Sequence, residues 1–140
     1  MFRDPNFARR VPPHFKERYK KVHATRVANM KLARRCGVLM AMGTDAGTPG
    51  NHCGDNMQEL EVMVEEAGFP PAEAIHAATL GAADMMGLAS DLGSLEEGKI
   101  ADVIATATDP LKNIAALRQV SFVMKGGRIH KQNGVSLPFV

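Results

Sequence analysis

One aspartate of this sequence stands where chemistry is expected. Asp45 lies in a loop rich in Gly and Thr, directly after the apolar residues 38–42, which are typical of a short buried strand. In α/β proteins, reactive groups gather at the carboxyl ends of strands, because loops there can vary without disturbing the sheet. A carboxylate in this place can bind a metal ion or accept a proton from water. The alternative is a local Asx-turn, which is common for Asp beside Thr and Gly.

A second candidate, His52, follows Pro49-Gly50-Asn51 in the same loop region. A neutral imidazole can donate or accept a hydrogen bond near physiological pH, so His52 can contact a polar substrate. A surface histidine with no ligand is the other interpretation, and both stay open. The five histidines of the chain show neither His-x-His nor His-Glu-x-x-His spacing, so the sequence contains no complete histidine metal motif.

Helices are predicted on both sides of this loop. Apolar residues recur mostly at three- or four-residue steps over residues 14–35 and 56–67, which predicts two amphipathic helices. Asn56 is predicted to cap the second of these through a capping box. A third helix is predicted to open at Pro71, and a short fourth to be capped by Thr79.

The last third of the chain is rich in strand-forming residues. Three β-prone runs are predicted to form strands: residues 101–107, 120–124 and 128–131. The pair Gly126-Gly127 suits a tight type I′ hairpin, because both of its central residues need positive φ. The order of elements predicts an α/β fold, in which a parallel α/β unit passes into a small β element near Leu92.

The composition is that of one modest globular domain. The 140 residues are 45% hydrophobic and 23% charged, and no apolar stretch approaches the roughly 18 residues that predict a membrane span. The N-terminus lacks the apolar block of a secretory signal, which favours the cytoplasm and no membrane partner. Cys36 and Cys53 are too few and too far apart for a disulfide framework or a zinc knuckle, so we interpret both as free thiols.

Charge is distributed unevenly along the chain. Residues 1–35 contain eleven Lys and Arg against two acidic residues, whereas residues 36–140 contain six against thirteen. A basic helix can bind nucleic acid, but this one contains only Phe15 and Tyr19 as aromatic residues and no recognisable reading motif. We therefore expect no nucleic-acid partner, and we predict that the basic face is solvated or pairs with the acidic remainder.

Seven short phrases occur in one order over about residues 14–131. They are GVLMAMGTDAG at 37–47, NH at 51–52 with GDN at 54–56, EL at 59–60, PAEAI at 71–75 with AT at 78–79, LGSLEEGKIAD at 92–102, DPL at 109–111 and VMKGG at 123–127. Together they resemble the metal-dependent amidohydrolases, in particular the imidazolonepropionase and prolidase-like branch.

The resemblance implies a fold and a cofactor. In this family the matching region is the last strand and helices of a (β/α)₈ barrel followed by strands of a small β-sandwich. Residues 1–91 would then belong to the barrel and residues 92–140 to the sandwich. Asp45 falls on the last-strand aspartate that binds metal and acts as the base. Zinc is the metal expected for the complete enzyme, although most of the family's ligands cannot be located in this chain and Cys53 interrupts a His-Gly pair.

The resemblance also implies a reaction. The substrate would be a small molecule, namely a dipeptide, an acylated amino acid or a cyclic amide, and the C–N bond would be hydrolysed. A complete barrel of this type takes at least about 200 residues, so the chain is expected to be a C-terminal portion that needs the missing N-terminal barrel portion. The alternative is a non-catalytic fragment or a self-associating assembly piece, because isolated parallel strands leave apolar edges bare.

Overall fold

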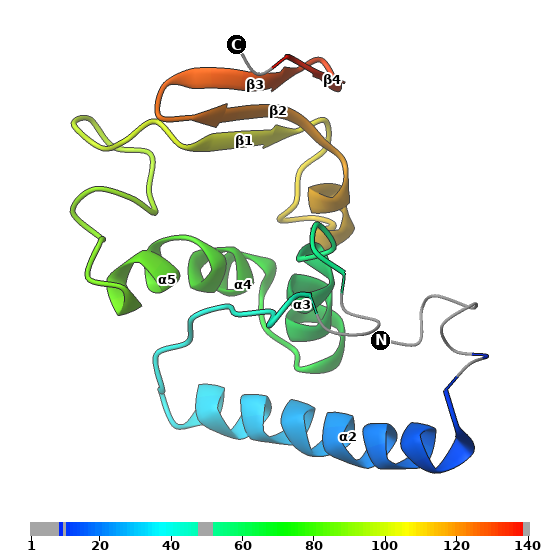
Figure 1. Cartoon of the computed structure of the whole chain (residues 1–140). Helices are drawn as coiled ribbons and strands as arrows, with labels where there is room; N and C mark the ends of the chain where they lie inside the picture. The colour runs from blue at the N-terminus through cyan, green and yellow to red at the C-terminus, as the bar shows by residue number, and fades with distance from the viewer. Residues whose placement is uncertain (1–8, 10, 48–51, 139–140) are drawn as a thin grey trace.

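The computed structural model describes residues 9, 11–47 and 52–138, and it shows a group of helices followed by a four-stranded sheet (Figure 1). The elements are α2 (Pro13–Arg35), α3 (Met57–Glu61), the π-helix η1 (Val62–Glu66), α4 (Pro71–Ala78), α5 (Leu80–Met85), β1 (Val103–Thr106), the 3₁₀-helix η2 (Ile114–Arg118), β2 (Val120–Lys125), β3 (Arg128–Gln132) and β4 (Val135–Ser136). In Figure 1 the sheet lies at one end of the molecule and α2 at the other, with α3, α4 and α5 between them.

The basic helix α2 is attached to the other helices mainly by its charges. None of its residues is buried. The imidazole of His23 lies 2.7 Å from the Glu66 carboxylate, Arg26 lies 3.5 Å from Glu59, and Arg34 lies 2.6 Å from Glu73. Val27 and Met30 add partly buried apolar contacts to the core. The predicted helix at residues 14–35 is therefore confirmed, as is the pairing of this basic segment with the acidic remainder.

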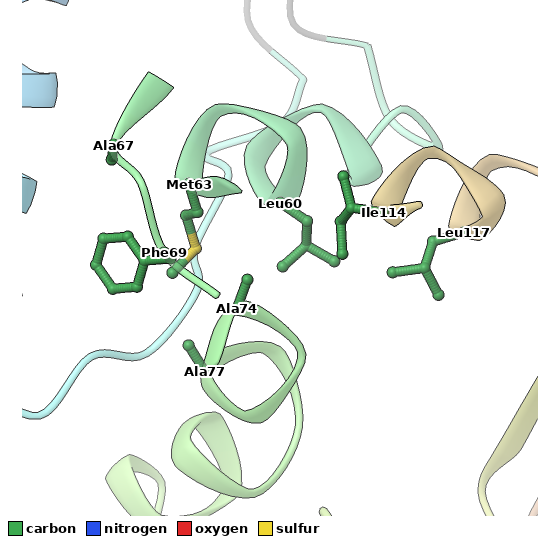
Figure 2. Packing of buried hydrophobic residues seen from close by; sticks show 8 residues of the cluster. All are labelled: Leu60, Met63, Ala67, Phe69, Ala74, Ala77, Ile114 and Leu117. Carbon is green, nitrogen blue, oxygen red and sulfur yellow. The ribbon is translucent and has the colours of Figure 1, made fainter. Parts of the chain in front are cut away.

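The apolar core lies where α3, η1, α4 and η2 meet (Figure 2). Its buried side chains come from two distant parts of the sequence, so the core connects the helices to the segment that leads into the sheet. The members are Leu60, Met63, Ala67, Phe69, Ala74, Ala77, Ile114 and Leu117. Since Ile114 and Leu117 lie beside Leu60 in this cluster, η2 is held firmly against α3.

The four strands form one antiparallel sheet in the order β1-β2-β3-β4. Gly126 and Gly127, with φ of 56° and 78°, connect β2 to β3 and confirm the predicted type I′ hairpin. A second hairpin at Asn133-Gly134, with φ of 51° and 78°, adds β4, which the sequence analysis missed. The signal was present, because Asn-Gly is a favoured pair for the same turn.

Three local predictions are wrong. Residues 38–42 do not form a buried strand: Leu39 is 89% exposed and only Met42 among them has a backbone bond to a distant element, donating to the Ala77 carbonyl over 2.8 Å. A parallel strand needs neighbouring strands for its backbone groups, and the described residues contain only an antiparallel sheet. Asn56 and Thr79 occupy cap positions, but neither side chain caps its helix, and the Thr79 hydroxyl donates instead to the Ile75 carbonyl.

Two further expectations can be compared with the structure. Cys36 and Cys53 are free and exposed, as interpreted. Among residues 9, 11–47 and 52–138, no helix has the combination of length and apolar composition that a membrane crossing requires.

Candidate active site

Asp45 lies in the loop that follows α2 and approaches α4. Its side chain is exposed and its backbone is left-handed, with φ of 49°. Among the described residues other than glycine, Asn133 alone shares a positive φ, and there a hairpin turn requires it. Asp tolerates this conformation better than most residues, but the conformation still costs energy and occurs often at functional sites. The left-handed backbone of Asp45 directly precedes a turn at Ala46-Gly47.

His52 begins the next described segment and is also exposed. Asp45 and His52 flank residues 48–51, which include Thr48 and Asn51 of the predicted loop and lie outside the described residues. The segment from His52 to Asp55 turns back on itself, since the Asp55 backbone N–H donates to the His52 carbonyl over 3.2 Å. Gly54 allows this turn with φ of 94°.

A charged cluster contacts the His52 segment at Asp55. The Arg118 guanidinium donates through Nε and Nη2 to the two oxygens of Glu61, and through Nη1 to Asp55 Oδ1 over 2.7 Å. The other oxygen of Asp55 accepts a hydrogen bond from the Gln58 side chain. Glu61 is only 3% exposed and is the one buried charged residue in the described part of the chain. The hydrogen bonds that Arg118 donates to Glu61 and Asp55 hold the pKa of its guanidinium above the usual range, although burial acts in the opposite direction.

The sequence analysis missed this cluster. It singled out neither Glu61 nor Arg118. The helical spacing of Met57, Leu60, Glu61 and Val64 does put Glu61 on the apolar face, so the periodicity contained a signal. Its partner Arg118 lies 57 residues further along the chain, and no local pattern connects the two.

The described residues do not by themselves fit a complete metal centre. No group of three or more His, Cys, Asp or Glu side chains within residues 9, 11–47 and 52–138 is arranged to hold a metal ion. A catalytic zinc ion normally takes three protein ligands and keeps one position open for water. The described residues alone thus do not supply such a set of ligands.

Comparison with known proteins identifies related sequences and structures. Residues 10–130 match the sequence model of the Amidohydrolase family. Ochratoxinase from Aspergillus niger is 39% identical over 127 residues, which cover 86% of this chain and 26% of the relative. Imidazolonepropionase from Shouchella clausii is 32% identical over 117 residues, which cover 81% of this chain and 26% of the relative.

A solved structure shows the same similarity in three dimensions. The crystal structure of a Xaa-Pro dipeptidase with bound methionine in its active site superposes with a TM-score of 0.70 at 37% identity, covering 75% of this chain and 25% of that one. This chain thus spans about a quarter of the length of its relatives. The match over residues 10–130 includes both the helices and most of the sheet, and from it we conclude that the chain belongs to the amidohydrolase family.

Proposed function

We propose that this chain is the C-terminal portion of a metal-dependent amidohydrolase that hydrolyses C–N bonds of small amides or dipeptide-like substrates. Asp45 is the group that we assign to catalysis and metal binding, and His52 is assigned to substrate binding. The observation that carries the proposal is the exposed Asp45 carboxylate, held at φ of 49° within a segment that resembles the family's last-strand phrase. Relatives named as an imidazolonepropionase and a Xaa-Pro dipeptidase support the substrate class.

The proposal places residues 1–91 in the last part of a (β/α)₈ barrel and residues 92–140 in a small sandwich. In that setting residues 38–42 would pair with barrel strands that the described residues do not contain. The exposure of Leu39 and Val38 supports this, since these apolar side chains have no cover within the described structure. Zinc would be the metal, with its other ligands supplied by the preceding barrel strands.

The chemistry assigned to Asp45 is proton transfer. An ionised carboxylate can take a proton from the water that attacks the amide carbon and deliver it to the nitrogen as the C–N bond breaks. General acid–base groups of this kind contribute about 10²–10⁴-fold to rate. We therefore expect Asp45→Asn to lower the rate of hydrolysis by at least about 10²-fold.

The experiment joins residues 1–140 to the part of Aspergillus niger ochratoxinase that precedes its matching region. Bound zinc per chain and release of amine from an Xaa-Pro dipeptide are measured for the joined protein and for the 140-residue chain alone. Asp84→Asn is the matched control, because Asp84 is also an exposed aspartate but lies on α5. A joined protein in which Asp45→Asn hydrolyses as fast as Asp84→Asn contradicts the role of Asp45, and hydrolysis by the isolated chain contradicts the requirement for the barrel portion.

A second candidate function is self-association without catalysis. The observation in its favour is the number of large apolar side chains at the surface, where Leu39 is 89%, Leu95 80% and Met85 71% exposed. Where exposed apolar side chains form a contiguous patch, that patch commonly marks a surface for a partner. The molar mass of the isolated chain in solution, measured by light scattering, separates the two: a stable dimer or larger assembly supports this candidate, and a monomer opposes it.

A further inference from the structure

Arg118 connects the sheet-forming part of the chain to the segment that begins at His52. It is the last residue of η2, one residue before the start of β2, and its guanidinium contacts Glu61 on α3 and Asp55 at the end of the His52 segment. Neither contact belongs to the metal or to proton transfer. The cluster therefore needs an explanation of its own.

Neutralising Glu61 does not use all of the Arg118 side chain. A buried carboxylate needs a partner, because an unpaired charge in the protein interior is strongly unfavourable. Two guanidinium nitrogens, Nε and Nη2, already satisfy both oxygens of Glu61. The third nitrogen, Nη1, reaches Asp55 over 2.7 Å, and this contact is not required for the pairing with Glu61.

Asp55 links the Arg118 side chain to the backbone of the His52 segment. One of its oxygens is held by Arg118 and the other by Gln58. Its backbone N–H closes the turn by donating to the His52 carbonyl. The position of His52 is thus fixed at its C-terminal side through Asp55.

The other end of the connection is rigid. η2 is seated on α3 through Ile114 and Leu117, which are 4% and 8% exposed (Figure 2). Arg118 follows Leu117 immediately, so its backbone cannot move far while the core is intact. A bidentate arginine contact also has a fixed, planar geometry, which a lysine in the same place would not reproduce.

We propose that Arg118 is a positioning residue that holds the His52 segment in place through Asp55, using the buried Glu61 as its fixed support. The functional part of this inference rests on the proposed function, because His52 is the residue that the proposed function assigns to substrate binding. It adds that the sheet-forming part of the chain sets the geometry of the site without contacting the substrate.

The test uses Asp55→Asn in the 140-residue chain. This change leaves the pair between Arg118 and Glu61 in place, but it removes the negative charge of Asp55 and one of its two acceptor oxygens. NMR spectroscopy measures the hydrogen-exchange protection of the backbone amides of residues 53–55 and the ring signals of His52. We expect the protection of the Asp55 amide, which donates to the His52 carbonyl, to fall about tenfold or more after correction for intrinsic exchange rates, while the amides of β2 and β3 change less than about twofold.

Glu73→Gln is the matched control. It removes a carboxylate that accepts two hydrogen bonds from Arg34, in a pair between α4 and α2 that involves neither η2 nor the His52 segment. The proposal predicts unchanged protection at residues 53–55 and unchanged His52 signals in this variant. Arg118→Lys is the second variant, and it should loosen the His52 segment at least as much as Asp55→Asn, because it also weakens the pairing with the buried Glu61.

Unchanged protection and unchanged His52 signals in Asp55→Asn would overturn the proposal, because Arg118 would then serve only to neutralise Glu61. If Arg118→Lys fails to fold, Asp55→Asn decides alone. The measurement needs neither metal nor substrate, so its outcome is independent of whether the joined protein hydrolyses amides through Asp45.

Discussion

Replacing Gly93 by alanine should destabilise the protein more than the same replacement at a positive-φ glycine whose surroundings are open. Gly93 begins the connection from the helices to the sheet and has φ of 92°. An added Cβ would lie 2.7 Å from the Leu80 Cα and 2.8 Å from the Ala83 Cβ. Carbon atoms in contact normally stand about 3.5–4.0 Å apart, so the backbone around α5 has to shift.

The magnitude has two parts. A residue with a Cβ in left-handed backbone costs roughly 1–2 kcal/mol, and overpacking a well-filled contact costs roughly 1–3 kcal/mol more. We therefore expect Gly93→Ala to lower the free energy of unfolding by about 2–5 kcal/mol. A loss of this size is a large fraction of the stability of an ordinary domain.

Gly87→Ala separates the two parts. Gly87 has φ of 72°, and nothing lies within 4 Å of the Cβ that alanine would add. This control should lose only the conformational part, about 1–2 kcal/mol. The assay is urea unfolding followed by circular dichroism, in which a shift of the midpoint at constant slope reports the stability change. Equal losses in the two variants would refute the reasoning, because the close approach to Leu80 would then have no energetic consequence.

Three other changes test separate features. The Gly126 N–H donates a hydrogen bond of 2.7 Å to the Asp102 carboxylate and lowers the pKa of that carboxyl. The stabilisation of the folded state by this hydrogen bond should therefore be present above the unfolded pKa, near 3.8, and lost as pH falls through the folded pKa. Asp102→Asn should remove this acid dependence from the NMR chemical shift of the Gly126 amide. The hydrogen bond from Arg34 on α2 lowers the pKa of Glu73 on α4, so the attachment of α2 to α4 should weaken in acid and in high salt. The measurement is the rate of amide hydrogen exchange in α2, which should rise under both conditions. An unchanged exchange rate in 1 M salt would contradict an electrostatic attachment. Ile114→Ala should cost about 2–5 kcal/mol in urea unfolding, because Ile114 is 4% exposed in the core, and a loss below 1 kcal/mol would show that η2 is not held by this contact.

Much of the helical structure followed from short-range pattern. The apolar spacing of residues 14–35 predicted a helix that the structure shows at Pro13–Arg35. Pro71 opens α4 as expected, and Gly126-Gly127 forms the expected hairpin. These features depend on neighbouring residues only, through helical periodicity, fixed proline φ and positive glycine φ.

The candidate site could be predicted only in part from the sequence. The family phrase singled out Asp45, but its left-handed backbone was not predicted, and residues 38–42 were expected to form a strand that the described structure does not contain. A strand is a property of a pair of segments, so the segment alone cannot form it.

The sequence by itself thus determined the amphipathic helices, the hairpin glycines and the resemblance that leads to the amidohydrolase family. Only the tertiary structure decided that Glu61 is buried, that Arg118 neutralises it, and that Asp55 accepts a hydrogen bond from the remaining guanidinium nitrogen. The reason is physical: helix and turn preferences act over a few residues, whereas the pairing of a buried charge depends on which distant side chain packing brings within hydrogen-bond distance.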